Sequence, residues 1–407
     1  MSFETLGVHP EIARALSEKE IISPTMIQEQ AIPLIAEGKD VIGVSKTGSG
    51  KTAAFGVPLL SRVTPGQGLQ ALILVPTREL AVQISRELQA FGKYFRHNII
   101  TIFGGVSLAP QMEQIPHADI IVGTPGRILD HMSRRTLSLT GISCLVLDEA
   151  DKMVEMGFIE DIERIISQTP ENRQMLLFGA TISGEVDYLV GRYMHDPAFI
   201  EAERQVEADL LKQFYYNVEH HEKFSLLVHL LKQEQAAMRQ AIIFCSARST
   251  VEIVARNLHN QGIRAEMMHG KLSQSKRLQV IDGFNRGNAA ILVASSVAAR
   301  GLDIKEVTHI FNYDLAPDPQ EYIHRIGRTA RAGESGKAIT LLSSKDHDVF
   351  RDILRRFDVD VEALPLEEFP RLRFEARRQQ HGFRGGPRNG FRGGGFRPRP
   401  RYARHNY

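Results

Sequence analysis

A stretch suited to phosphate chemistry lies between residues 45 and 52, with the sequence Ser-Lys-Thr-Gly-Ser-Gly-Lys-Thr. A short apolar run, Val41 to Val44, precedes it, and a helical pattern follows it. Strand, glycine-rich loop and helix is the order that a phosphate-binding loop requires. Gly48 and Gly50 carry no Cβ, so the backbone can turn its N–H groups toward an anion, and the positive end of the following helix adds to that field.

Two side chains of this loop could handle a nucleotide directly. Lys51 would reach the β- and γ-phosphates, and the Thr52 hydroxyl would ligate Mg²⁺. Position 45, usually Gly or Ala in this pattern, is a serine small enough to be tolerated. A plain glycine-rich turn is the alternative interpretation, and the rest of the chain argues against it. The candidate nucleotide-binding residues of the loop are Ser45, Lys46, Thr47, Gly48, Ser49, Gly50, Lys51 and Thr52.

Adjacent carboxylates follow an apolar run about a hundred residues later, in the sequence Asp148-Glu149-Ala150-Asp151. At the carboxyl end of a strand, such a pair can divide the work of ATP hydrolysis. Asp148 would hold Mg²⁺ through water, and Glu149 would orient and polarise the attacking water. An isolated acidic run is often only a solvated loop, but behind a phosphate loop and a strand it predicts ATP hydrolysis.

The elements that must position these residues are short apolar runs that alternate with helical stretches. In the first half the runs are Val41–Val44, Leu69–Val75, Ile99–Phe103, Asp119–Val122, Cys144–Leu147 and Met175–Phe178. Continuous apolar runs between helices indicate a parallel sheet covered on both faces. Right-handed crossovers then give a doubly wound α/β domain.

A second series of the same kind follows, but it has no phosphate loop of its own. Its runs are Phe214–Val218, Ala241–Cys245, Ala265–Met268, Ala290–Ala294, His309–Asn312 and Lys337–Leu342. The polar stretch 201–212 is the predicted linker between the two series. We therefore predict an α/β protein of two tandem domains, over residues 1–205 (with an N-terminal segment, 1–40) and 206–368, followed by a basic tail, 369–407.

Composition places the chain among soluble globular proteins. It has 407 residues, of which 43% are hydrophobic and 24% are charged. The two cysteines, Cys144 and Cys245, lie in apolar runs without a CxxC partner, so we expect reduced, buried thiols in the cytoplasm. We recognise no signal peptide, and no apolar run approaches the ~20 residues needed to span a bilayer. We therefore predict no membrane partner.

The C-terminal tail is strongly basic, whereas the body of the chain is acidic. Residues 371–407 hold eleven Arg and one Glu, a charge of +10 within a total of +2, which leaves −8 for the first 370 residues. Two segments, Phe383–Gly386 and Phe391–Gly395, are RGG-type repeats. Gly and Arg at this density cannot bury enough apolar surface to fold, so we expect disorder from about Arg377. Arginine for phosphate and aromatic rings for bases predict RNA binding, with a merely solubilising linker as the alternative.

The phosphate loop and the Asp-Glu-Ala-Asp motif together resemble the DEAD-box family of RNA-dependent ATPases. The resemblance covers residues 3 to about 365, with further motifs in the family's order. These are Pro76-Thr77-Arg78-Glu79-Leu80-Ala81, Gly104-Gly105, Thr124-Pro125-Gly126-Arg127, Ala299-Arg300-Gly301-Leu302-Asp303-Ile304 and His324-Arg325-Ile326-Gly327-Arg328-Thr329-Ala330-Arg331. The resemblance implies two RecA-like domains, ATP and Mg²⁺ as cofactors, and RNA as partner, gripped with little sequence preference.

The resemblance also implies a role for each matching residue. Arg78 and Arg127 would meet RNA phosphates at loops that follow strands, and neighbouring glycines would let the RNA backbone approach. The RNA-binding candidates are Pro76, Thr77, Arg78, Gly104, Gly105, Thr124, Pro125, Gly126, Arg127, Ser295, Arg300 and Gly301. Taken singly, each would more often be a surface arginine or a turn glycine.

The ATP-site roles implied by the resemblance come from both halves of the chain. Arg328 and Arg331, three residues apart, would act as arginine fingers on the γ-phosphate. Asp303 matches a ribose contact, and Gln28 can read the adenine edge with one donor and one acceptor. The remaining implied contacts are Phe3 for stacking on the base, and Thr181, Asp151 and His324 for coupling ATP to RNA.

The sequence departs from the family pattern at three places. Glu20-Ile21 replaces a Gly-aromatic pair near Gln28, which puts the local packing in doubt. Gly179 replaces the serine of a Ser-Ala-Thr motif that links hydrolysis to strand separation, which predicts weaker coupling. Ser295-Ser296 replaces Thr-Asp, so one hydroxyl is kept and a carboxylate is absent.

We predict an ATP-dependent RNA helicase that separates or remodels short RNA duplexes. An ATP-gated RNA clamp with weak unwinding is the first alternative, and the Gly179 departure favours it. A processive DNA translocase is the second, against which Glu79 and the acidic quartet argue. Comparing the rate of ATP hydrolysis with the rate of strand displacement separates the helicase from the clamp. A DNA-only substrate separates both from the DNA translocase.

Overall fold

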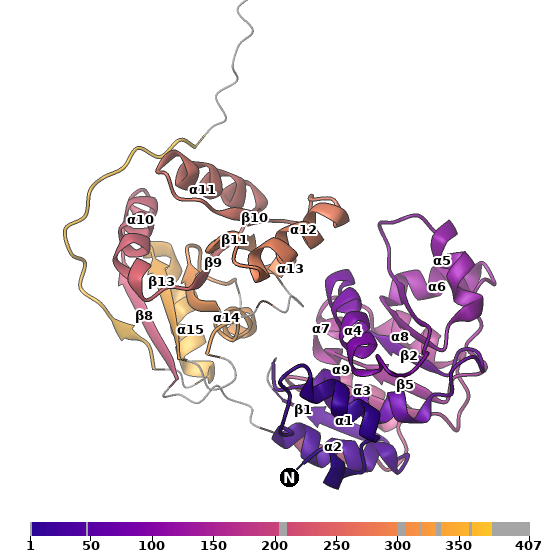
Figure 1. The fold of residues 1–407 in the computed structure, drawn as a ribbon. Helices are drawn as coiled ribbons and strands as arrows, with labels where there is room; N and C mark the ends of the chain where they lie inside the picture. The colour runs from indigo at the N-terminus through magenta and orange to yellow at the C-terminus, as the bar shows by residue number, and fades with distance from the viewer. Residues whose placement is uncertain are drawn as a thin grey trace, which may run out of the picture. The chain divides into compact units, whose positions relative to one another are not determined.

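The structure is a computed structural model. It describes residues 2–45, 48–202, 210–299, 304, 307–317, 319–330, 335–357 and 360–376. Two seven-stranded sheets run through these residues, one in each half of the chain, and every pairing between their strands is parallel. Figure 1 shows each sheet with its helices around it.

The first sheet has the order β3-β4-β2-β5-β6-β1-β7, which places the phosphate-loop strand β1 beside β6. Its strands are β1 (Val41–Val44), β2 (Ala71–Leu74), β3 (Ile99–Ile102), β4 (Ile120–Gly123), β5 (Cys144–Leu147), β6 (Gln174–Gly179) and β7 (Ala198–Glu201). The helices of this half are α1 (Pro10–Ser17), α2 (Met26–Ala36), α3 (Lys51–Arg62), α4 (Arg78–Phe91), α5 (Ala109–Gln114), α6 (Pro125–Ser133), α7 (Ala150–Glu155), α8 (Ile159–Ile166) and α9 (Gly184–Tyr193).

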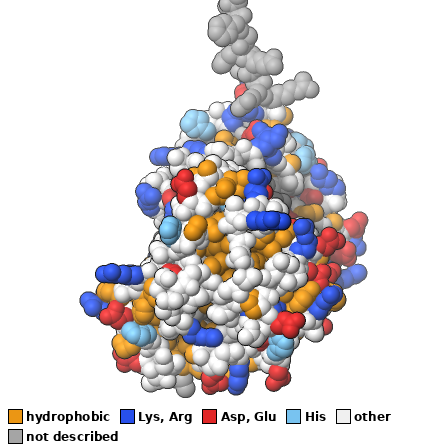
Figure 2. Space-filling model, turned by 90° about the vertical axis from the view of Figure 1, so that its right-hand side faces the viewer, with side chains coloured by type: hydrophobic (Ala, Val, Ile, Leu, Met, Phe, Trp, Pro, Cys, Tyr) orange, Lys and Arg blue, Asp and Glu red, His pale blue; other side chains and the backbone are white. Residues whose placement is uncertain are grey.

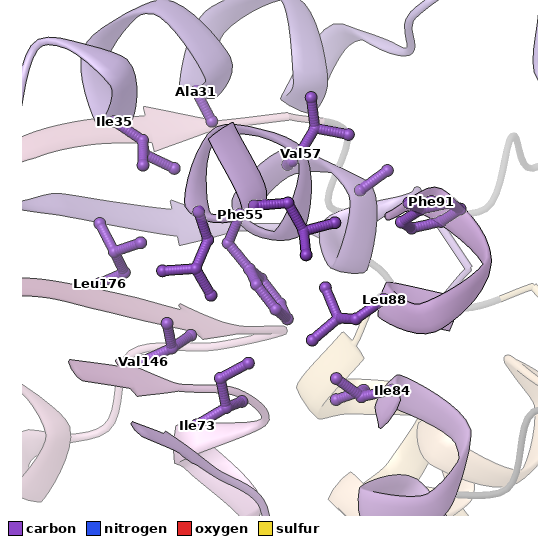
Figure 3. Packing of buried hydrophobic residues seen from close by; sticks show 14 of the residues in the cluster. Ala31, Ile35, Phe55, Val57, Ile73, Ile84, Leu88, Phe91, Val146 and Leu176 are labelled. Carbon is purple, nitrogen blue, oxygen red and sulfur yellow. The ribbon is translucent and has the colours of Figure 1, made fainter. Parts of the chain in front are cut away.

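Both faces of the first sheet are buried except at the edge strand β7, because alternate residues of the other strands enter different cores. In β5, Val146 belongs to the core under α1–α4, and Leu145 belongs to the core under α6–α9. Figure 3 shows the Phe55 ring of α3 directed toward strand residues such as Val146 and Leu176, with Leu88 of α4 beside it. This packing fixes α3, and with it the helix end that follows the phosphate loop.

The second sheet repeats this architecture in the order β10-β11-β9-β12-β13-β8-β14. Its strands are β8 (Leu211–Asn217), β9 (Gln240–Cys245), β10 (Glu266–Met268), β11 (Ile291–Ser295), β12 (Val307–Asn312), β13 (Gly336–Leu342) and β14 (Glu362–Ala363). Its helices are α10 (Lys223–Gln233), α11 (Arg248–Asn260), α12 (Gln274–Asn285), α13 (Ser296–Ala299), α14 (Pro319–Ile326) and α15 (His347–Phe357).

The predicted fold class, two tandem doubly wound parallel sheets, is confirmed. Each of the twelve apolar runs contains or overlaps a strand. Two edge strands, β7 and β14, were not predicted. The predicted linker was too long, because Glu201 ends β7 and Leu211 begins β8, and residues 203–209 lie outside the described part of the chain.

After β14, residues 364–374 form an extended segment along α10, which we call the strap. Phe369, Leu372 and Phe374 pack against the core beneath α10, and the Phe374 ring lies 5.1 Å from that of Phe224. The Leu372 amide donates to Ser225 Oγ at 3.0 Å. The start of the predicted tail is therefore part of the packed second half up to Phe374, while residues 377–407 lie outside the described chain.

Among the described residues, no helix is both long and apolar enough to cross a membrane. Cys144 and Cys245 are free and buried, as predicted. The buried environment raises the pKa of the Cys144 thiol to about 12, so this side chain stays protonated and unreactive.

Candidate active site

The predicted phosphate loop joins β1 to α3. Gly50 caps α3 with φ of 89°, a left-handed conformation, and a Cβ at this position would lie 2.2 Å from Gln28 Nε2. Only glycine fits there without displacing Gln28. The Lys51 ammonium is buried and donates to the Ser45 carbonyl at 2.6 Å, and the Ser45 and Ser49 hydroxyls lie 2.7 Å apart. Two predicted members, Lys46 and Thr47, lie outside the described residues.

Gln28 connects the N-terminal segment to this loop. Its Oε1 accepts from the Thr25 amide at 3.0 Å, and its Nε2 donates to the Gly50 carbonyl at 3.0 Å. Thr25 Oγ1 also donates to the Ser49 carbonyl at 2.8 Å. The amide of Gln28 keeps one further hydrogen and one lone pair, so the predicted contact with the adenine edge is compatible with these bonds and stays a prediction.

The side chain of Phe3, the residue predicted to stack on the base, is buried in the hydrophobic core. Its side chain is 4% exposed and belongs to the core with Val8 and Ile12, so the ring offers no open face to a base. Glu20, at the position where the family commonly has glycine, has φ of 62°. The backbone therefore keeps the left-handed turn without glycine, at a cost in strain.

The acidic motif follows β5 at the carboxyl edge of the sheet. Asp148 and Glu149 are both buried, and Glu149 occupies a left-handed conformation (φ 53°) that begins α7. Burial raises the pKa of Asp148 to about 7, with Lys51 opposing the shift and the Glu149 charge adding to it. Burial also acts against ionisation of Glu149, but the positive charges of Lys152, at 2.7 Å, and of Arg328 and Lys51 outweigh it and hold the pKa of Glu149 at about 2.

The surroundings of Asp148 and Glu149 thus give the two carboxyl groups different pKa values. Glu149 is ionised and held in place by Lys152, as a residue that orients water must be. Asp148 is a buried carboxyl group whose negative charge would be stabilised by a cation, and its role as a metal ligand stays a prediction. We find no cluster of three or more His, Cys, Asp or Glu that could cage a metal in the described part of the chain. An ion held by Asp148, the Thr52 hydroxyl and nucleotide phosphates is the arrangement that suits Mg²⁺.

Asp151, the last residue of the acidic motif, holds the loop after β6. Its Oδ2 accepts from the Ala180 amide at 3.0 Å, the Thr181 amide at 3.1 Å and Thr181 Oγ1 at 3.3 Å. Asp151 and Thr181 are therefore in direct contact, and their predicted role in coupling ATP to RNA stays a prediction. The amide of Ser45 donates to the Gly179 carbonyl at 3.0 Å, which joins this loop to the phosphate loop.

The predicted RNA-binding loops of the first half come together at the same edge. Arg78 begins α4, and its guanidinium lies over Gly105, where a Cβ would be 2.1 Å from Nη1. Arg127 lies in the first turn of α6 and donates to the Val106 carbonyl at 3.2 Å. The glycine pair therefore makes room for arginine side chains. Pro76, Thr77, Gly104, Thr124, Pro125 and Gly126 flank these two arginines in the same loops.

A buried network that the sequence analysis missed supports Arg127. Gln111 Oε1 accepts from Arg127 at 3.2 Å and from His131 at 3.1 Å, while Gln111 Nε2 donates to the Phe103 carbonyl at 3.1 Å. His131 is completed by Thr136 Oγ1 at 2.9 Å. Gln111 thereby joins the Gly-Gly loop to the loop that carries Arg127. Only a polar residue on the buried side of a helix could have signalled it.

In the second half, Arg328 is buried and His324 lies in α14. The Arg328 charge is one of the influences that lower the pKa of Glu149, in agreement with a contribution from the second half to the ATP site. Ser295 ends β11 and is half-buried. The other four predicted residues of this half, Arg300, Gly301, Asp303 and Arg331, lie outside the described residues.

A contact between the two halves was also missed. Glu79, buried in α4, accepts from Gln274 Nε2 at 3.0 Å and pairs with Arg277 at 2.9 Å. Nearby, Arg86 and Asp282 form an exposed ion pair at 3.2 Å. Residues 274 and 277 lie on α12, where their spacing alone resembled an ordinary polar helix face.

The domains match two helicase families. Residues 25–189 match the DEAD/DEAH box helicase domain, and residues 222–333 match the helicase conserved C-terminal domain. These matches place the chain among the helicases.

Curated relatives show to which family of helicases the chain belongs. The DEAD-box ATP-dependent RNA helicase CshA of Geobacillus kaustophilus is 42% identical over 364 residues, which is 88% of this chain and 78% of the relative. The ATP-dependent RNA helicase CshA of Listeria monocytogenes is 44% identical over 353 residues, 86% of this chain and 67% of the relative. The chain belongs to the DEAD-box ATP-dependent RNA helicase family.

Solved structures agree. The S. cerevisiae protein Dbp5, bound to RNA and ADP BeF3, is 33% identical with a TM-score of 0.81, over 89% of this chain and 95% of that one. A DEAD box protein from Methanococcus jannaschii is 38% identical with a TM-score of 0.56, over 90% of this chain and 99% of that one. Both confirm the tandem RecA-like architecture.

Proposed function

We propose that this chain is an ATP-dependent RNA helicase in which RNA-stimulated ATP hydrolysis drives the local separation of short RNA duplexes. The observation that carries the proposal is the geometry of the acidic motif. A buried, ionised Glu149 lies beside a buried Asp148, and both follow a strand at the edge that holds the phosphate loop. Burying two adjacent carboxylates is costly, which favours a catalytic role for this pair.

Each residue then has a defined task. Lys51 and the loop amides bind the β- and γ-phosphates, and Glu149 orients the attacking water while Lys152 keeps it ionised. Arg328 stabilises the charge that develops on the γ-phosphate. Thr52 and Asp148 are the proposed Mg²⁺ ligands, and when bound the ion neutralises phosphate charge.

RNA is gripped through its backbone by Arg78 and Arg127. Figure 2 shows a face on which Lys and Arg side chains alternate with Asp and Glu around a largely uncharged middle. The face in view carries no broad positive patch (Figure 2). The RNA contacts that we propose are local ones, made by particular arginines that are supported from beneath, as Gln111 supports Arg127. Such contacts read phosphates rather than bases.

Coupling between the two sites runs through Asp151 and Thr181, with His324 proposed as the corresponding group of the second half. Gly179 favours the second candidate function, an ATP-gated RNA clamp with weak unwinding, because it lacks the hydroxyl that the family has there. We also propose that the first domain spans residues 1–205, and that the second begins at residue 206 and extends through the strap to Phe374. The cytoplasm remains the predicted location, on the basis of the free buried cysteines.

The test compares two rates on one preparation. ATP hydrolysis is measured with single-stranded RNA, short RNA duplex and matched DNA, and strand displacement is measured on the duplexes. A helicase gives RNA-stimulated hydrolysis and displacement of the RNA duplex. Hydrolysis without displacement supports the clamp, and equal stimulation by DNA contradicts RNA as the substrate.

A further inference from the structure

A buried arginine follows His324 in α14. The Arg325 side chain is 2% exposed, and its three nitrogens each have a different partner. Nε donates to Ser296 Oγ at 2.8 Å, Nη1 donates to the Asp314 carbonyl at 2.6 Å, and Nη2 donates to Glu321 Oε1 at 2.6 Å. The guanidinium also lies 5.2 Å from the centre of the Phe244 ring.

Such a group needs a negative partner, because a buried unpaired charge is strongly destabilising. Burial lowers the pKa of Arg325, and the Glu321 carboxylate opposes that shift most strongly. The carboxylate of Asp314 is directed elsewhere and accepts from the amide and hydroxyl of Ser246. Among the ion pairs of the residues that the structure describes, Glu321 is the one carboxylate paired with Arg325, and its own side chain is 8% exposed.

Ser296 completes the coordination but carries no charge. It stands at the position where the family commonly has aspartate. Since Ser296 Oγ lies 2.8 Å from Arg325 Nε, a carboxylate at residue 296 would meet the same guanidinium from the end of β11. In this chain the carboxylate instead comes from α14, four residues before Arg325 and on the same helix face.

We propose that the counter-charge of Arg325 has moved from residue 296 to Glu321, and that Glu321 is a positioning residue for the turn that carries Arg328. The connection is through the backbone. The Arg328 amide donates to the Arg325 carbonyl at 3.1 Å, immediately after α14 ends. Loss of the Arg325 anchor would therefore displace Arg328. This second half of the proposal rests on the proposed role of Arg328 in hydrolysis.

The test is a double-mutant cycle in the full-length protein. Glu321→Gln keeps an amide oxygen as acceptor but removes the charge, and Ser296→Asp supplies a charge from the other side. The matched control is Asp348→Asn, which removes the charge of an exposed ion pair with Arg351 in the same half of the chain. Each variant is measured by its thermal unfolding midpoint and by kcat at saturating ATP and RNA.

We expect Glu321→Gln to lower the unfolding midpoint by roughly 6–12 °C and kcat by about 10- to 100-fold. Ser296→Asp alone should give no gain, because two carboxylates would then share one guanidinium. The double variant should recover most of both losses, and Asp348→Asn should change neither quantity. If the site merely tolerated no substitution, the second change would lower the unfolding midpoint and kcat further instead of restoring them.

A double variant no more stable than Glu321→Gln would overturn the relocated counter-charge. Recovery of the unfolding midpoint without recovery of kcat would overturn the positioning role of Glu321. A separate variant, Arg328→Ala, tests the proposed role of Arg328 in hydrolysis independently of the counter-charge of Arg325. If its kcat were unchanged, the proposed role of Arg328 would be wrong, while the unfolding midpoints would still decide the counter-charge.

Discussion

Serine at position 179 in place of glycine should increase the amount of RNA duplex separated per ATP hydrolysed. Gly179 ends β6 directly before the loop that Asp151 holds. A Cβ there would lie 3.2 Å from Asp151 Oδ1 and 3.3 Å from the Thr181 carbonyl, close enough to require shifts of a few tenths of an ångström. A serine hydroxyl on that Cβ can reach the Asp151 carboxylate.

The magnitude follows from this contact. A hydrogen bond to a charged group contributes ~1.5–3 kcal/mol, and the crowding by Cβ offsets part of it, so we expect a net gain of about 1 kcal/mol. That corresponds to about a fivefold increase in displacement per ATP if the gain appears in the coupled closed state. Gly179→Ala is the matched control, because it adds the same Cβ without the hydroxyl and should give no increase.

The assay measures duplex displacement and phosphate release in the same reaction. Equal ratios of displacement to hydrolysis for the serine and alanine variants would refute the reasoning, since the hydroxyl would then contribute nothing. A rise for both variants would show that the Cβ contact, and not the hydrogen bond, limits coupling.

Replacing Gln111 by leucine should raise the RNA concentration that half-saturates ATP hydrolysis by about 10-fold, since Arg127 loses its buried acceptor. The same change at exposed Gln114 should have no effect, and equal responses of the two variants would contradict the support of Arg127 by Gln111. Glu20→Gly should raise the free energy of unfolding in urea by up to about 1 kcal/mol, because φ at this residue is 62°; a loss of stability would contradict the strain. Cutting the chain after residue 378 removes seven arginines, and if three or four bind phosphate at once, the slope of log affinity against log salt for single-stranded RNA should fall by about 2–3. That cut should leave the thermal unfolding midpoint unchanged, whereas a cut before residue 369 should lower it by removing the strap.

The sequence predicted the parts of this protein that depend on local pattern. Apolar runs located both sheets because each strand that is buried on two faces is apolar throughout. The edge strand β7 was not predicted because it is half-exposed, with the Phe199 side chain open to solvent and Glu201 at its end. The strap was assigned to the tail because arginines alternate with Leu372 and Phe374, and only the packing on α10 shows which residues face inward.

The candidate site likewise contains residues that could be predicted from local sequence pattern and residues that could not. The phosphate loop and the acidic motif could be predicted because their spacing along the chain dictates their chemistry. The burial of Phe3 could not be predicted because a family motif does not say which way the ring points, and the fold directs it into the core. Gln111 was missed because its partners, Arg127 and His131, lie 16 and 20 residues further along the chain. Glu321 was missed because a Glu and an Arg four residues apart look like an ordinary surface pair, and only the folded protein shows that both are buried.

Glu149 is central to the proposed mechanism as the group that orients the attacking water. Glu149→Gln should bind ATP nearly as well as the unaltered protein, because the side chain has the same shape, while RNA-stimulated hydrolysis falls by ~10²–10⁴. The same substitution at exposed Glu155 of α7 serves as the control and should leave hydrolysis unchanged. Single-turnover hydrolysis with RNA bound, measured beside ATP affinity, tests this claim most directly. A loss of hydrolysis with ATP affinity preserved is the predicted result, and near-normal turnover in Glu149→Gln would contradict the account.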